Sequence, residues 1–345
     1  MLRQIQKFSR ITSHLALPTV FCLSVPAQQS PAQRTLAIRP LLVVHGGVDD
    51  AGPGQLSTQE EAAVRAGITR ALTEGYAVMK KGGTSVDAVE AALRTFEDDT
   101  TFDAGRGAVV NTEGVAELDA AIMNGQTLQA GAVAAVHHIA HPISLARLVM
   151  ERTRHVMLVG DGAEEFAQAQ GIGLVPNDYF ITESQRLKFE QWKAQHSGAA
   201  GHLGAPGHLG TTGAIALDAH GNLAAGTTTG GTSWKLPGRV GDSPILGAGT
   251  YANNAFGCAV SSSGTGEYFM RDTIAVDICH RVAYLHQTVD RAADFVIHTE
   301  LKTQGGDGGV IALDRMGHFV AVFNTHAFWR GSIGPDGKPH VEIFQ

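Results

Sequence analysis

Two similar apolar hairpins in the second half of the chain constrain its fold most strongly. Residues 213–218 read Gly-Ala-Ile-Ala-Leu-Asp and residues 309–314 read Gly-Val-Ile-Ala-Leu-Asp, and a glycine turn and a second strand-like run follow each, at 223–229 and 319–323. The first runs are apolar nearly throughout instead of alternating, which is typical of strands covered on both faces. We therefore expect paired sheets with helices outside them, one helix spanning residues 267–285.

The first half of the chain alternates predicted helices and strands. Ser57 and Glu60 form a capping box ahead of apolar residues at helical spacing, and Gly82-Gly83 ends this helix. A second helix opens at Ser85 and a third at Pro142. The apolar stripes of the first two helices indicate core packing and carry no chemistry. Strands are predicted over 41–44, 121–123, 130–136 and 156–159, with an Asn-Gly turn at 124–125.

The composition favours a small-molecule partner. A chain of 345 residues, 43% hydrophobic and 17% charged, can bury one large core or two modest ones. The net charge is -7 and Lys and Arg do not cluster, which argues against a nucleic-acid partner.

The N-terminus resembles an export signal. Basic residues at 3, 7 and 10 precede an apolar run over 15–25, and Val25-Pro26-Ala27 offers small residues for cleavage. A membrane anchor or a frayed tail are the alternatives, but the run is short and Pro18 interrupts it. We expect residues 1–27 to be a signal peptide, the mature protein to be periplasmic or secreted, and no membrane association after cleavage.

The sequence leaves the state of two cysteines open. Cys258 and Cys279 remain after signal removal and could pair in an oxidising compartment. Sequence spacing does not establish disulfide geometry, and buried free cysteines are common.

The Gly210-Thr211 bond is the first candidate for chemistry. A Gly- and His-rich linker, residues 196–210, ends at this bond, and an apolar strand follows it. A threonine here could attack the preceding peptide bond, and the freed α-amine, with a reference pKa of about 7.7–8.0, could then activate its hydroxyl. Gly210 tolerates the strained backbone that such an attack requires. The alternative is an ordinary threonine at the start of a strand.

Three downstream stretches supply groups that suit this chemistry. The threonines at 227–229 would lie beside the first strand of the hairpin. Arg239 and Asp242 suit the carboxylate and ammonium of an amino acid, although such a pair is also typical of a surface ion pair. The turn at 261–266 offers a hydroxyl and N–H groups to an oxyanion; as a phosphate loop it would lack the lysine and the spacing.

Together these residues resemble the plant-type asparaginases and isoaspartyl aminopeptidases, a family of N-terminal-nucleophile hydrolases. The resemblance spans about residues 40–330, with several long motifs in order. The matching stretches are His45-Gly46-Gly47, residues 102–108 and 117–120, residues 210–214, 221–225 and 227–231, residues 236–244, 247–249 and 251–254, residues 264–267, and residues 305–309.

The resemblance implies an α+β protein built as a four-layer αββα sandwich. A precursor would cut itself between Gly210 and Thr211 into an α subunit, residues 28–210, and a β subunit, residues 211–345, which together form one folded domain. Two such units would assemble as an (αβ)2 heterotetramer.

The resemblance also implies roles for single residues. Thr211 would be the nucleophile, and Thr229 would support both cleavage and catalysis. Ser263 and the Gly264 N–H would form the oxyanion hole. The substrate would contact Arg239 through its α-carboxylate and Asp242 and Gly266 through its α-amine, with Gly231, Val240, Gly241 and Thr265 also lining the site.

Two positions depart from the family pattern. Ser263 stands where the family usually has threonine, which keeps the hydroxyl but loses the methyl group that fixes its rotamer. Asp103 stands where the family often has asparagine, and its carboxylate could alter how the cleavage site is held. Relatives bind a sodium ion through backbone carbonyls of the loop that corresponds to Phe96–Phe102, so a structural sodium is an expectation for this chain.

The resemblance implies hydrolysis of L-asparagine and β-aspartyl dipeptides, with no organic cofactor. A glycosylasparaginase is the alternative enzyme, although its relatives usually have Asp where this chain has Gly210 and Asn where it has Thr265. A non-catalytic binder of acidic amino acids would retain Arg239 and Asp242 without needing Thr211. A zinc site at His137, His138 and His141 is not expected, because their spacing scatters them over an extended segment.

Overall fold

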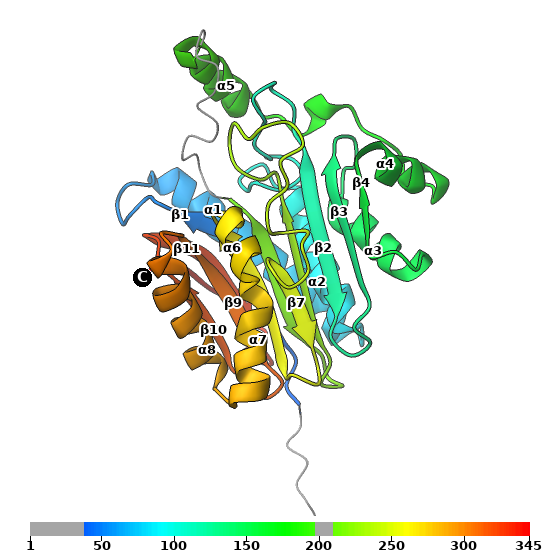
Figure 1. Ribbon diagram of the computed structural model, residues 1–345, viewed down its shortest axis with the longest axis vertical. Helices are drawn as coiled ribbons and strands as arrows, with labels where there is room; N and C mark the ends of the chain where they lie inside the picture. The colour runs from blue at the N-terminus through cyan, green and yellow to red at the C-terminus, as the bar shows by residue number, and fades with distance from the viewer. Residues whose placement is uncertain (1–37, 197–209) are drawn as a thin grey trace, which may run out of the picture. The chain divides into compact units, whose positions relative to one another are not determined.

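The computed structural model describes residues 38–196 and 210–345. The expected signal peptide and residues 197–209 of the expected linker lie outside the described residues. Within the described part, the strands form one eight-stranded and one four-stranded sheet (Figure 1).

The large sheet has the order β12-β11-β1-β5-β6-β2-β3-β4. Its pairs are antiparallel except for β3 and β4, which are parallel. The strands of this sheet are β1 (Leu41–Asp49), β2 (Leu118–Asn124), β3 (Ala130–Val136), β4 (Met157–Val159), β5 (Thr212–Leu217), β6 (Leu223–Thr229), β11 (Ala327–Ile333) and β12 (His340–Phe344).

The small sheet is antiparallel throughout and has the order β10-β9-β8-β7. Its strands are β7 (Thr250–Asn253), β8 (Cys258–Gly264), β9 (Gly308–Asp314) and β10 (Phe319–Phe323). The two apolar hairpins of the sequence are therefore β5–β6 and β9–β10, one in each sheet.

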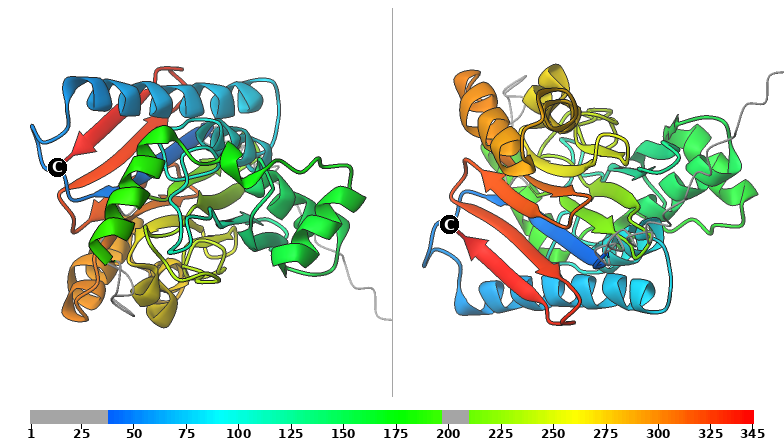
Figure 2. Two further views of the ribbon diagram at one scale, coloured as in Figure 1. Left: turned by 90° about the horizontal axis from the view of Figure 1, so that it is seen from above. Right: turned by 90° about the horizontal axis from the view of Figure 1, so that it is seen from below.

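Helices cover the outer faces of the two sheets, which gives the expected αββα order (Figure 2). Helices α1 (Thr58–Lys80), α2 (Ser85–Glu97) and α3 (Pro142–Arg152) share a buried apolar cluster with the large sheet. Helices α7 (Ile274–Leu285) and α8 (Val289–Phe295) share another with the small sheet. A third cluster, which includes Val43, Ile215 and Ile311, fills the space between the sheets. The β5 and β9 runs are apolar throughout because both of their faces are covered.

The remaining helices are short or peripheral. They are α4 (Gly160–Ala169), the 3₁₀ turn η1 (Asn177–Tyr179), α5 (Glu183–His196), α6 (Gly266–Asp272) and the π-helical segment η2 (Val296–Leu301).

Local sequence signals place several helix ends correctly. Ser57 and Glu60 form the reciprocal hydrogen bonds of a capping box at the start of α1. The second helix begins at Ser85, and Thr84 supplies its N-cap hydrogen bond. The third begins at Pro142, where its missing N–H costs no intrahelical bond.

The prediction of one helix over 267–285 is wrong. Thr273 has a left-handed backbone with φ 49° and separates α6 from α7. The first N–H groups of α7 donate instead to the Ala248 and Gly247 carbonyls, at 3.1 and 2.8 Å. Helix periodicity does not detect such a break, because both segments keep apolar residues on the sheet side.

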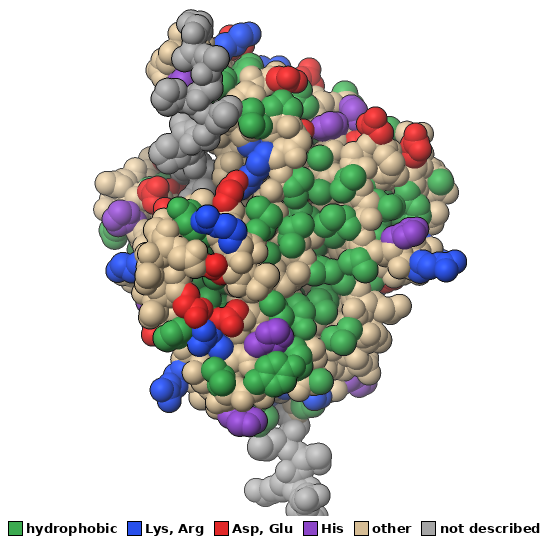
Figure 3. Space-filling model, in the orientation of Figure 1, with side chains coloured by type: hydrophobic (Ala, Val, Ile, Leu, Met, Phe, Trp, Pro, Cys, Tyr) green, Lys and Arg blue, Asp and Glu red, His purple; other side chains and the backbone are tan. Residues whose placement is uncertain are grey.

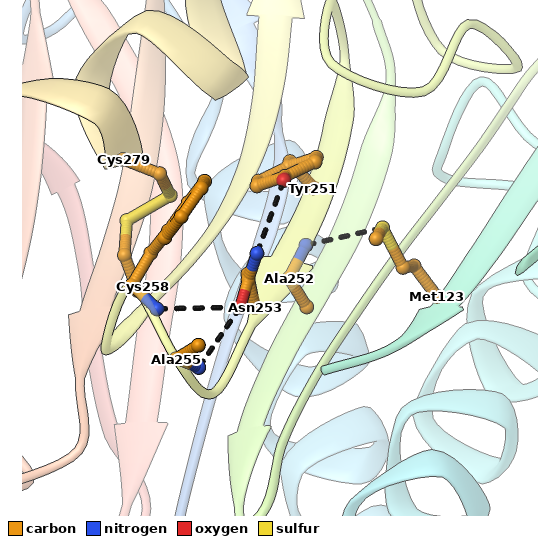
Figure 4. The surroundings of a disulfide bond; sticks show 8 residues. Met123, Tyr251, Ala252, Asn253, Ala255, Cys258 and Cys279 are labelled. Carbon is orange, nitrogen blue, oxygen red and sulfur yellow. Dashed lines mark hydrogen bonds between the residues drawn. A yellow bond between two sulfur atoms is a disulfide. The ribbon is translucent and has the colours of Figure 1, made fainter. Parts of the chain in front are cut away.

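The structure joins Cys258 and Cys279 in a disulfide, with Cα atoms 5.4 Å apart (Figure 4). The bond links β8 to α7 beside Asn253, whose Nδ2 donates to the Tyr251 hydroxyl at 3.3 Å. The pairing that the sequence left open depends on α7 packing over β8.

The described residues include no helix that is both long and apolar enough to cross a membrane. The three histidines at 137–141 face separate carboxylates: His138 lies 2.8 Å from Glu164, and His137 and His141 lie 3.5 and 3.3 Å from Glu117 and Glu97.

Candidate active site

The β5–β6 hairpin places Thr211 beside Thr229. Thr212 pairs with Thr228 across the two strands, so the preceding threonine lies next to the end of β6. The Thr211 Oγ1 donates to Thr229 Oγ1 at 3.2 Å, and Thr229 Oγ1 donates to the Gly210 carbonyl at 3.0 Å. The Gly231 N–H donates to the same Thr229 oxygen at 2.9 Å.

This arrangement connects the nucleophile candidate to the bond that it would attack. One hydroxyl, that of Thr229, accepts from Thr211 and donates to the carbonyl of Gly210. A hydrogen bond to a carbonyl oxygen stabilises negative charge that develops there during attack. The Gly231 N–H orients the Thr229 hydroxyl, and Gly231 itself has φ 91°, which favours glycine.

A buried hydrogen-bonded network of His45, Ser261 and Thr227 packs against β5 near Thr211. The His45 Nε2 lies 2.9 Å from Ser261 Oγ, which lies 2.7 Å from Thr227 Oγ1. A Cβ at Gly213 would lie 2.0 Å from Ser261 Oγ, so only glycine fits there. Burial lowers the pKa of His45 to about 3, although a backbone hydrogen bond with Thr211 partly opposes this. The imidazole is therefore neutral near pH 7 and positions Thr211 without carrying charge.

Arg239 and Asp242 both line the narrow pocket around Thr211. The Gly266 backbone packs against both side chains, because a Cβ there would lie 2.8 Å from Asp242 Oδ1 and 3.1 Å from Arg239 Nη2. Burial raises the pKa of the Asp242 carboxyl to about 7. Its Oδ2 has no hydrogen-bond partner among the described residues, so it is suited to an ammonium group.

Arg239 is already paired with a carboxylate. Its Nε and Nη2 both donate to Glu267, each at 2.9 Å. The geometry is the bidentate fork that an α-carboxylate would use. A bound amino acid would therefore compete with Glu267 for the guanidinium.

The oxyanion-hole candidates lie at the end of β8. The Val48 N–H donates to Ser263 Oγ at 3.2 Å, which ties this hydroxyl to β1. Gly264 lines the narrow pocket around Thr211. The Thr265 hydroxyl turns away and donates to Asp307 at 2.5 Å.

A narrow pocket brings most of the expected residues together. It measures about 10 Å³, room for no more than one water molecule, so the intact chain leaves no space for an amino acid. Ser263, Val240, Thr265 and Gly266 do not line it. The residues that line it are Gly210, Thr211, Thr229, Gly231, Thr232, Arg239, Gly241, Asp242, Ser243 and Gly264.

Lys235 is a buried charge that sequence reasoning missed. Its Nζ donates to the Glu117 carbonyl at 2.9 Å and lies 4.0 Å from the Glu117 carboxylate. It also opposes the rise in the pKa of Asp119 that burial causes. Lys235 therefore ties the segment that carries Gly231 and Arg239 to Glu117, the residue immediately before strand β2. The sequence shows only a lysine between Trp234 and Leu236, which does not indicate burial.

Asp103 lies directly against the expected cleavage site. A Cβ at Gly210 would lie 2.5 Å from the Asp103 Cβ, and the Val109 N–H donates to Asp103 Oδ1 at 2.8 Å. Burial raises the pKa of this carboxyl to about 7, while hydrogen bonds and Lys235 oppose the rise. The departure from asparagine thus places a group that titrates near neutral pH beside Gly210.

Comparison with known proteins identifies the family of this chain. Residues 38–343 match the protein family described as Asparaginase. The human isoaspartyl peptidase/L-asparaginase is 43% identical over 311 residues, which cover 89% of this chain and 96% of the relative. The isoaspartyl peptidases of Salmonella typhimurium and Escherichia coli are each 42% identical over 301 residues, covering 85% of this chain and 94% and 92% of those proteins. With its αββα layers and its residues gathered around Thr211, the chain belongs to the asparaginase family.

Proposed function

We propose that this enzyme hydrolyses the side-chain amide of L-asparagine and the isopeptide bond of β-aspartyl dipeptides, after cutting its own chain at Gly210-Thr211. The observation that supports this most directly is the position of Thr229 Oγ1, within hydrogen-bond distance of both Thr211 Oγ1 and the Gly210 carbonyl. The names of the relatives support the substrate class. A binder without catalysis would not need these contacts.

The first reaction would be an acyl shift within the chain. Thr211 Oγ bonds to the Gly210 carbonyl carbon, the bond from that carbon to the Thr211 nitrogen breaks, and the hydroxyl proton moves to the departing amine. Thr229 donates to the carbonyl oxygen as its negative charge develops. Water then hydrolyses the ester, which releases the Gly210 carboxylate and restores the Thr211 hydroxyl.

The second reaction would use the freed α-amine of Thr211 as the base. The amine takes the hydroxyl proton while Oγ attacks the β-carbonyl of the substrate, and it passes this proton to the leaving ammonia or amine. Water hydrolyses the aspartyl ester and releases L-aspartate. Ser263 and the Gly264 N–H would stabilise the oxyanion, and Arg239 and Asp242 would hold the α-carboxylate and the α-ammonium.

A denaturing gel tests the first step directly. The purified protein should convert into two chains, and the smaller should begin at Thr211. Thr211→Ala should remain one chain and hydrolyse neither substrate. A wild-type protein that stays full-length and still releases L-aspartate would contradict the proposal.

Assembly as an (αβ)2 heterotetramer is part of the proposal. Figure 3 shows hydrophobic side chains gathered in the middle of one face, where Figure 1 draws β2, β3 and β7. Apolar surface of this kind is typical of an interface between subunits. The mass of the cut protein in solution tests this assembly.

The mature protein would also be exported and would hold a structural sodium ion. The disulfide supports an oxidising compartment such as the periplasm. The backbone carbonyl oxygens of the Phe96–Phe102 loop would be the ligands of the sodium ion, because a hard cation such as sodium takes oxygen ligands. The hydrolysis as proposed uses no organic cofactor.

A further inference from the structure

A second and much larger cavity lies beside Gly210. Its volume is about 690 Å³, and its lining mixes aromatic and polar side chains. Asp103, Ser233 and Trp234 line it from the side of the cleavage site, and Ala63 lines it from α1.

Helix α5 forms one wall of this cavity, through residues that include Gln185 and Lys188. The Gln185 Nε2 donates to the carbonyls of Gly107 and Ala108, and these hydrogen bonds hold the start of the helix against that segment. Further along the helix, the Trp192 ring stacks on Trp234 with centroids 5.2 Å apart. The helix is thus held in place although none of its residues is buried.

Trp234 lines the cavity and belongs to the segment that carries Gly231 and Arg239. It follows Gly231 by three residues, and its φ of 60° is a left-handed conformation that a bulky residue rarely adopts. Such strain persists where the surroundings hold a residue in place, and here the Trp192 and Phe189 rings pack against it.

Gly210 lies between this cavity and the narrow pocket around Thr211. It lines the narrow pocket and packs against Asp103, which lines the cavity. Once the bond to Thr211 is cut, Gly210 is a chain end that can leave this position. Its departure would open the narrow pocket toward Asp103, which lines the cavity.

We propose that, in the cut enzyme, this cavity binds the leaving group of a β-aspartyl dipeptide, with Lys188 contacting its terminal carboxylate. The inference rests on the proposed function, because it concerns the leaving side of the same reaction. Lys188 is the one Lys or Arg among the described residues that line the cavity, and Phe102, Trp234 and Trp329 give apolar walls to a side chain. Glu60 lies at the same wall with its carboxylate accepting the Ser57 N–H of the capping box.

The first test asks whether Lys188 recognises the terminal carboxylate of the dipeptide. Lys188→Met should lower kcat/KM about fivefold for β-aspartyl-leucine, the effect of losing one partly exposed ion pair. It should leave β-aspartyl-leucine amide and L-asparagine unchanged, since neither presents that carboxylate. Lys193→Met is the matched control, on the same helix and outside the cavity lining. An equal loss on all three substrates, or equal behaviour of the two variants, would overturn the role of Lys188.

The second test fills the cavity. Ala63→Phe should lower kcat/KM for β-aspartyl-leucine about tenfold and leave L-asparagine, which releases only ammonia, within twofold. Ala62→Phe, the exposed neighbour on α1, should change neither. Unchanged dipeptide hydrolysis by Ala63→Phe would overturn the cavity as the leaving-group site. If the wild-type enzyme failed on all of these substrates, the proposed function itself would be wrong.

Discussion

At the scale of single residues, one hydroxyl group links the steps of the proposed chemistry. Thr229 contacts Thr211, Gly210 and Gly231 through a single oxygen. Loss of this hydroxyl should therefore slow self-cleavage far more than loss of only the adjacent methyl group.

Thr229→Ala should slow self-cleavage by about 100-fold or more, the usual cost of removing one donor to a developing oxyanion. Thr229→Ser is the matched control, because it keeps the hydroxyl and should stay within about tenfold of wild type. The rate at which the full-length band disappears on a denaturing gel measures both. Cleavage of Thr229→Ala at the wild-type rate would show that the Gly210 carbonyl does not depend on this donor.

Glu267→Gln tests whether the substrate carboxylate competes for Arg239. The pair is bidentate, but the Glu267 side chain is 53% exposed, so the competition is modest. We expect KM for L-asparagine to fall by about two- to fivefold with little change in kcat, since a weaker partner leaves the guanidinium available. Glu61→Gln, which loosens the exposed pair with Arg65, should leave both constants unchanged. A rise in KM for Glu267→Gln would mean that Glu267 positions Arg239 for the substrate.

At the scale of secondary-structure elements, local signals determined the starts of α1, α2 and α3 and the two apolar hairpins, because capping residues and turn glycines act within a few residues. The break at Thr273 and the disulfide escaped prediction. Both depend on α7 packing against segments distant in sequence, namely the turn at Gly247 and strand β8.

The disulfide should stabilise this packing by about 3 kcal/mol, the loop-closure value for a separation of about 21 residues. A variant carrying both Cys258→Ala and Cys279→Ala should therefore unfold at lower denaturant concentration while keeping its activity under mild conditions. Reductant should lower the midpoint of the wild type and leave the double variant unchanged. Equal sensitivity of both proteins to reductant would contradict a stabilising role for this bond.

At the scale of the whole molecule, two carboxyl groups lie enclosed near the expected cleavage site. Burial raises the pKa values of Asp103 and Asp242 to about 7. An unfolded aspartate has a pKa of about 3.9, so the folded protein holds these protons more tightly. These two carboxyl groups should therefore contribute most to the free energy of unfolding below about pH 4, where both are protonated. That contribution should be lost as the pH rises through about 7.

Asp103→Asn should remove part of this pH dependence. In a Thr211→Ala background, which keeps every protein uncut, the variant should match its parent near pH 4 and melt several degrees higher at pH 8, where the parent carboxylate is charged. Thermal melts at both pH values measure the difference. Asp178→Asn, at an exposed carboxylate, is the control and should give no such gain. An equal Tm difference at both pH values would show that Asp103 does not titrate in this range.

The sequence by itself determined the family, the two apolar hairpins, the main helices and strands of the first half, and the candidates at Thr211, Thr229, Arg239 and Asp242. It could do so because these signals are local or occur as motifs in a fixed order. The tertiary structure decided which side chains share a space: the burial of Lys235, the pairing of Glu267 with Arg239, the contact of Asp103 with Gly210 and the cavity beside α5. Burial and charge pairing arise only when distant segments pack together, so no local pattern in the chain could reveal them.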